Sequence, residues 1–169
     1  MNSITSLENK LQSTESNALQ RNDHIQYVTF AVQDQLFGIP ALLIEEIVSM
    51  LPFTKIPLAP KEIAGTLNLR GRIVTALNIR TLLELPDRTE NEKFMNIVVS
   101  NKNDLYSLIV DKVDEVMVLS QSSISSNPSS MSETWQHYSD GVYQIKDKLL
   151  IILKPDALLK TKQKVSNKG

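Results

Sequence analysis

Residues 65–83 read GTLNLRGRIVTALNIRTLL, and residues 141–159 read GVYQIKDKLLIILKPDALL. Both segments begin with glycine, end in two leucines and align without a gap. In each, two apolar runs flank a short polar turn, which is typical of a β-hairpin, and a short helical segment follows. A second pair, residues 37–48 and 106–117, matches in the same order and aligns Glu46 with Glu115. Such self-similarity at a long, nearly constant offset indicates a duplicated unit.

The duplication predicts two small, pseudo-symmetric β-subdomains. Further β-branched and aromatic runs predict strands, and prolines with a capping asparagine bound short helices. The expected strands outside the hairpins are 27–32, 36–39, 46–51, 95–100, 105–110 and 113–119, and the expected short helices are 40–44, 79–85 and 155–160. About five short strands in each subdomain suit a small closed barrel, which hides its strand edges. The predicted fold class is therefore mainly β, with a groove between the subdomains as the natural place for a partner.

The domain organisation follows from composition. The folded domain is expected at 25–160, with two intertwined β-barrel subdomains at roughly 27–86 and 94–155. Residues 1–24 are rich in Ser, Asn, Gln and Thr and indicate a disordered or weakly helical leader, and 161–169 form a Lys-rich tail. The leader lacks the apolar core of a signal peptide and no segment has the ~18 apolar residues of a membrane span, so a cytoplasmic location without membrane insertion is expected.

Composition excludes several kinds of chemistry. The 169-residue chain contains no cysteine, which rules out disulfides, thiolate metal sites and thiol nucleophiles. The motifs GxGxxG, GxxxxGK[ST], GxSxG and HExxH are missing. His24 and His137 are expected to be solvated. Clustered carboxylates are expected to be surface charges, because neighbouring side chains on a strand point to opposite faces; they are Glu45, Glu46, Asp111, Asp114 and Glu115. No enzymatic activity, metal or cofactor is predicted.

Two residues leave alternatives open. Arg70 stands at the predicted turn of the first hairpin, where it is either a plain surface arginine or a contact residue with five donors and aliphatic reach. Trp135, the single tryptophan, either anchors the Ser-rich loop at 120–134 to the core or is an exposed contact.

A small β-barrel could also bind nucleic acid, but such a binder needs a basic face and exposed aromatic residues. With a net charge of −1 and 5% aromatic residues, nucleic acid is not an expected partner.

Residues 68–80, NLRGRIVTALNIR, closely resemble the signature of CheW-type chemotaxis coupling proteins: NLRG, an alternating apolar strand, then an acidic cap followed by Leu-Arg. Other segments resemble the family in order and spacing, and they are 27–30, 37–39, 46–47, 56–57, 63–65, 109–113, 141 and 149–159. The resemblance covers residues 26 to 160.

The resemblance implies two five-stranded SH3-like barrels without catalytic activity, which are monomeric when free. Family members couple transmembrane chemoreceptors to the histidine kinase CheA, and the cytoplasmic tip of a receptor docks along the groove between the subdomains. By resemblance, the receptor-binding residues are Ile44, Asn68, Arg70, Met95 and Val113. The residues implied to bind the regulatory domain of the kinase are Glu46, Val48 and Ile56, and the loop after Ile124 offers a second kinase surface.

The sequence departs from the family pattern at three places. Thr75 stands where proline is usual and restores a backbone donor, and Asn78 replaces an acidic cap. The loop at 125–130 lacks the basic, proline-rich character of many members. Alternative interpretations are therefore a scaffold of a divergent chemosensory pathway, such as one for pilus motility, or the coupling module of a CheV-like protein.

Overall fold

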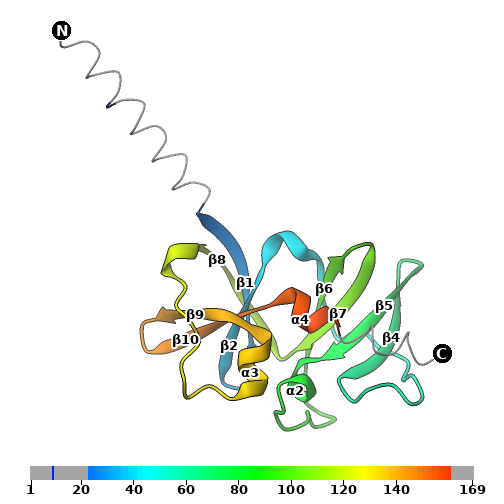
Figure 1. Ribbon diagram of the computed structural model, residues 1–169. Helices are drawn as coiled ribbons and strands as arrows, with labels where there is room; N and C mark the ends of the chain where they lie inside the picture. The colour runs from blue at the N-terminus through cyan, green and yellow to red at the C-terminus, as the bar shows by residue number, and fades with distance from the viewer. Residues whose placement is uncertain (1–8, 10–22, 161–169) are drawn as a thin grey trace.

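The computed structural model describes residue 9 and residues 23–160 (Figure 1). The expected tail at 161–169 and nearly all of the expected leader lie outside the described residues. The first half contains β1 (His24–Val32), β2 (Gln35–Pro40), η1 (Ala41–Leu43), β3 (Ile44–Ser49), β4 (Ile63–Leu69), β5 (Arg72–Asn78) and α2 (Ile79–Leu82). The second contains β6 (Met95–Asn101), β7 (Asp104–Val110), β8 (Lys112–Ser120), η2 (Gln121–Ser123), α3 (Glu133–Tyr138), β9 (Ser139–Ile145), β10 (Lys148–Leu153) and α4 (Pro155–Leu159).

The ten strands form two five-stranded sheets, with orders β8-β1-β2-β10-β9 and β3-β6-β7-β5-β4. If β1–β5 are matched in turn to β6–β10, one order converts into the other, as a duplicated unit requires. Each sheet takes two strands from one repeat and three from the other, so the segments 27–86 and 94–155 each contribute strands to both sheets. Within the described residues, both sheets end in edge strands instead of closing into the expected closed barrels.

Each sheet contains one parallel pairing, and it joins a strand of one repeat to a strand of the other. β10 lies parallel to β2, and β5 lies parallel to β7. Thr75, which stands in place of the family's proline, is paired on both sides, with Thr66 and with Tyr106. A proline could not donate a ladder hydrogen bond at this central strand position, so threonine suits a fully paired β5.

The glycines that open the two matching segments are required by close backbone approach. A Cβ atom on Gly65 would lie 2.2 Å from the carbonyl oxygen of Thr54, and one on Gly141 would lie 2.6 Å from that of Ser125. Both carbonyls belong to isolated bridges that extend the sheet, Thr54 with Thr66 and Ser125 with Val142. Any side chain at these glycines would push the bridge away.

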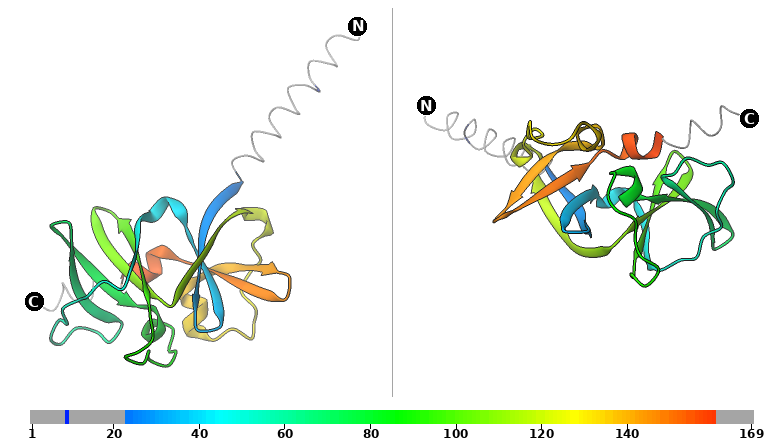
Figure 2. Two further views of the ribbon diagram at one scale, coloured as in Figure 1. Left: turned by 180° about the vertical axis from the view of Figure 1, so that it is seen from behind. Right: turned by 90° about the horizontal axis from the view of Figure 1, so that it is seen from below.

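The main hydrophobic core lies between the two sheets and is shared by them, and each sheet also has a smaller cluster of its own. Its fully buried members come from both sheets and both repeats, and include Phe30, Phe37, Leu77, Leu108, Leu153 and Leu158. α4 lies at the junction of the sheets in every view (Figures 1 and 2). Burying apolar surface contributes about 25 cal/mol of stability per Å², so this shared core is the main contribution that holds the subdomains together.

The Ser-rich loop contains two elements that the sequence did not predict, the short 3-10 helix η2 and, at the end of the loop, the helix α3. Ser132 caps this helix by accepting a hydrogen bond from the Trp135 backbone N–H, at 3.3 Å. The Trp135 indole N–H donates to the carbonyl oxygen of Leu83 at 2.8 Å, and its ring centroid lies 5.6 Å from that of Phe37. Of the two interpretations of Trp135, anchoring of the loop is therefore correct.

Candidate functional site

Strand β3 presents different residues on its two faces. Ile44 lies opposite Val99, a member of the shared core, whereas Glu46 lies opposite Val98, a member of the smaller cluster within the sheet. A bulge between Ile44 and Glu46 produces the change of side. Residues directly opposite on paired strands share a face, so the expected receptor residue Ile44 faces the junction of the sheets, and Glu46 and Val48 face the other way.

Arg70 and Glu46 form an ion pair with 2.8 Å between the guanidinium Nη2 and the carboxylate Oε1. Arg70 sits at the turn between β4 and β5, and because β3 and β4 are opposite edges of one sheet, the pair spans the opening between them. The Arg70 side chain is 77% exposed, and exposed pairs contribute about 0–1 kcal/mol. One expected receptor residue and one expected kinase residue therefore meet at this point.

The turn that displays Arg70 is formed by its sequence neighbours. Arg70 and Gly71 have φ angles of 53° and 81°, both in the left-handed region that a two-residue type I′ hairpin turn needs. The Asn68 side-chain oxygen accepts a hydrogen bond from the Gly71 N–H at 2.9 Å. The structure thus gives Asn68 a role in the turn, and its expected receptor contact stays a prediction.

The other expected site residues lie apart. Met95 and Val113 are half-buried against the shared core near the starts of β6 and β8, which belong to different sheets. Ile56 is in the long loop between β3 and β4 and is partly exposed.

Three exposed apolar side chains at the junction of the sheets were not expected from the sequence: Ile47, Val116 and Val118. Ile47 lies opposite Ile97 of the shared core, and Val116 lies opposite Val28, whose other neighbour Ile39 is also in that core. We call Ile47, Val116 and Val118 the inter-sheet apolar surface. The valines are 58% and 59% exposed. The run of four apolar residues at 116–119 on β8 is visible in the sequence, but only the strand register decides which of them face outward.

A cleft of about 640 Å³ opens between the β3–β4 loop and the segment that follows α2. Its apolar lining includes Met50, Phe53, Ile56 and Phe94. Charged residues of both signs also line it, among them Lys55, Lys61, Asp87 and Glu90. Ile56 therefore stands at the edge of a partly apolar depression.

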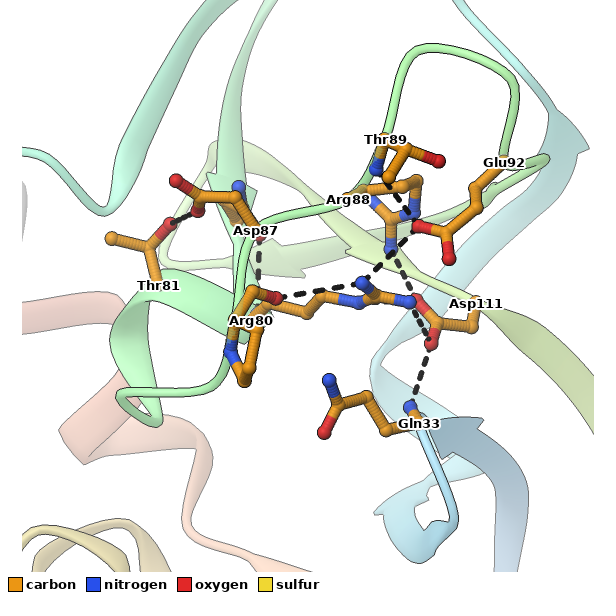
Figure 3. Close-up of polar contacts among 10 residues, drawn as sticks. Gln33, Arg80, Thr81, Asp87, Arg88, Thr89, Glu92 and Asp111 are labelled. Atoms are coloured by element: carbon orange, nitrogen blue, oxygen red, sulfur yellow. Dashed lines mark hydrogen bonds and ion pairs between the residues drawn. The ribbon is translucent and has the colours of Figure 1, made fainter.

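One wall of this cleft is held by the carboxylate of Asp111 (Figure 3). The Arg80 guanidinium donates two hydrogen bonds to this carboxylate, from Nε at 3.1 Å and from Nη2 at 2.7 Å, and Arg88 donates a further one. The Gln33 backbone N–H donates to Asp111 at 2.6 Å, and Glu92 accepts from Arg80 at 3.3 Å. The network thus joins the β1–β2 turn, α2, the cleft wall and the start of β8.

Asp111 is therefore not the surface charge that the sequence predicted. Its side chain is 17% exposed, and those of Arg80 and Arg88 are 8% and 10% exposed. Burial acts to raise the pKa of Asp111, but the hydrogen bonds from Arg80, the Gln33 N–H and Arg88 outweigh it and hold that pKa below its usual value. The sequence did not reveal this network because Gln33, Arg80 and Arg88 lie far from Asp111 along the chain.

Among residue 9 and residues 23–160, no group of His, Asp or Glu side chains is arranged to hold a metal ion. In the same part of the chain, no helix is long and apolar enough to cross a membrane. What the described surface offers is an apolar strip at the junction of the sheets, an ion pair beside β3 and a partly apolar cleft. These are features of a binding surface.

Comparison with known proteins decides the family. The family model for the CheW-like domain matches residues 26–163. This chain belongs to the CheW family. It is 26% identical over 136 residues to the chemotaxis protein CheW of Helicobacter pylori, covering 80% of this chain and 82% of the relative. It is 26% identical over 152 residues to that of Treponema pallidum, covering 86% and 89%.

The fold agrees with a solved CheW structure. The scaffolding protein TtCheW from Thermoanaerobacter tengcongensis superposes with a TM-score of 0.69 and 29% sequence identity, covering 77% of this chain and 84% of that one. The expectation of a mainly β CheW-like fold with SH3-like subdomains is confirmed.

Proposed function

We propose that this CheW-family chain is a non-enzymatic adaptor that couples chemoreceptors to a CheA-type histidine kinase in chemotaxis. The observation that carries the proposal is the two-sided β3 strand, with Ile44 toward the junction of the sheets and Glu46 and Val48 away from it. One rigid strand can then hold two different partners at a defined distance. Relatives named as chemotaxis CheW proteins support the pathway.

On the receptor side, the helical tip of a receptor would lie along the junction of the sheets. Helix-in-groove recognition needs apolar positions that bury against the helix and a charged rim that sets its register. The expected residues Ile44, Met95 and Val113 border the shared core, and we add the inter-sheet apolar surface to them. Arg70, the remaining charged residue of the expected receptor set, supplies an exposed cation next to β3, where it pairs with Glu46.

On the kinase side, the regulatory domain of the kinase would contact Glu46, Val48 and Ile56. Ile56 and Met50 are exposed apolar residues at the edge of the cleft, which charged residues also line. Protein interfaces typically have such an apolar centre surrounded by a polar rim. The loop after Ile124 remains the proposed second kinase surface. Recruitment to membrane-associated receptor arrays would follow from these two contacts.

The proposal is tested by calorimetric titration against two partners, the regulatory domain of a CheA-type kinase and a receptor-tip fragment. Saturable 1:1 binding to the kinase domain in the micromolar range, about −8 kcal/mol, is expected. Val116→Glu and Ile56→Glu form a matched pair, because both change a partly exposed aliphatic residue to the same charge.

Val116→Glu should weaken receptor binding at least ~10-fold and leave kinase binding unchanged, and Ile56→Glu should do the reverse. Loss of both affinities in either variant, with the fold intact by circular dichroism, would contradict the assignment of separate surfaces. Absence of binding to both partners by the parent chain would overturn the adaptor function itself.

A further inference from the structure

The inter-sheet apolar surface lies close to the point where the chain enters the fold. Asp23 is tied to the far end of β8: its carboxylate accepts hydrogen bonds from the Ser120 and Ser122 hydroxyls, and its carbonyl oxygen accepts from the Gln121 N–H at 2.8 Å. His24 then pairs with Ser120. Along β8, Val118 and Val116 come two and four residues before Ser120. Whatever precedes Asp23 therefore starts beside this surface.

The segment that precedes Asp23 carries an apolar stripe in its sequence. Ile4, Leu7, Leu11 and Ala18 recur at spacings of three, four and seven, which place them on one face if the segment is helical. Ser, Thr, Asn, Gln and charged residues occupy most other positions. Asn9, which falls on the polar side of this pattern, is the one described residue of the segment and is helical and exposed.

We propose that residues 4–18 dock as an amphipathic helix on the inter-sheet apolar surface and compete there with the receptor. The identity of the competitor rests on the function proposed above, whereas the docking itself does not. The leader is favoured over a second copy of the chain because it is covalently attached beside the surface. A tether of a few residues gives an effective concentration in the millimolar range.

The dimensions fit this arrangement. Fifteen helical residues span about 22 Å, and the nine residues of β8 span about 30 Å. Residues 19–22 connect the stripe to Asp23, and connections of this length commonly reverse the chain between neighbouring elements. Docking would cover Val116 and Val118, which are more than half exposed. An apolar stripe and an exposed apolar strip would then each lose contact with water.

Docking is tested without any partner by paramagnetic labelling of the full chain. Because the chain contains no cysteine, Ser13→Cys gives a single site for a nitroxide. The methyl NMR signals of Ile47, Val116 and Val118 should broaden strongly, and those of Leu58 and Ile73, which are exposed elsewhere, should not. Introducing Leu7→Gln and Leu11→Gln together should abolish the broadening. Equal broadening at all five residues, or none at the valines, would overturn the proposal.

Competition is tested by the affinity for a receptor-tip fragment. If the docked form is about 90% populated, removal of residues 1–21 should tighten receptor binding about ten-fold. The Leu7→Gln/Leu11→Gln variant should reproduce this gain. Asn9→Gln/Ser13→Gln, with the same spacing on the polar face, should not.

The outcomes separate the two proposals. Specific broadening with no receptor binding by any variant would support docking and refute the receptor function. Receptor binding that is lost in Val116→Glu but unaffected by removal of the leader would support the receptor function and refute the competition.

Discussion

Asp111→Asn is expected to destabilise the fold strongly, although residue 111 lies in a run of charges that the sequence places at the surface. The substitution keeps the shape of the side chain and removes the charge that faces Arg80 and Arg88. Both arginine side chains are about nine-tenths buried, so they would lose their anion without regaining full hydration.

The loss of stability in Asp111→Asn follows from the contacts of the carboxylate with the two arginines. Breaking a buried pair by removing one partner costs about 3–5 kcal/mol, and each hydrogen bond to a charged group contributes about 1.5–3 kcal/mol. The remaining exposure of Asp111, 17%, lets water screen part of the loss. We therefore expect a loss of about 3 kcal/mol in the free energy of unfolding, or a fall in Tm of about 6–12 °C for a domain of this size.

Urea denaturation followed by tryptophan fluorescence measures this loss, because Trp135 is the only tryptophan and packs on Phe37 in the shared core. Asp114→Asn is the matched control, since Asp114 is an exposed neighbour on β8. Its effect should stay within about 0.5 kcal/mol. The reasoning is refuted if Asp111→Asn is as stable as Asp114→Asn, because the two arginines would then not need the carboxylate.

Three further predictions concern acid, glycine and the exposed ion pair. The pKa of Asp111 is lowered in the folded state, so its stabilisation is complete above about pH 5 and is lost as the pH falls through the unfolded pKa of about 3.9 to the lower folded pKa. Denaturation curves at several pH values should therefore show a shallower acid slope for Asp111→Asn, and an unchanged slope would contradict this. Gly65→Ala should lower the free energy of unfolding by about 3 kcal/mol, because the new Cβ would lie 2.2 Å from the Thr54 carbonyl oxygen. In Gly71→Ala the new Cβ meets nothing within 4 Å and only the φ of +81° is strained, so the loss should be about 1 kcal/mol. Equal losses of stability in thermal denaturation would argue against the close approach at Gly65. Arg70→Glu should weaken receptor binding and Glu46→Arg kinase binding in titrations, each with a stability change below about 1 kcal/mol, and a large fall in Tm would instead make Arg70 structural.

Much of the local structure could be predicted from the sequence because it depends on neighbours in the chain. The hairpin turn at Arg70-Gly71, the Asn78 cap on α2 and the start of α4 at Pro155 all occur where the pattern places them. In each case the signal is a glycine, an asparagine or a proline whose backbone preference acts within a few residues. α3 escaped prediction because serine-rich flanks concealed a short helix whose stability comes from Trp135 packing on the core.

The duplication, the strands and their turns can be derived from the amino-acid sequence alone, since they are encoded by spacing and local backbone preference. Four other features follow from tertiary packing. They are the choice of strands that each sheet takes from each repeat, the contact of Glu46 with Arg70, the burial of Asp111 between two arginines and the outward direction of Val116 and Val118. All four depend on strand register and on contacts between residues far apart in the chain. Shifting a strand by one residue exchanges its two faces, and the burial of a shared core between the sheets selects the register.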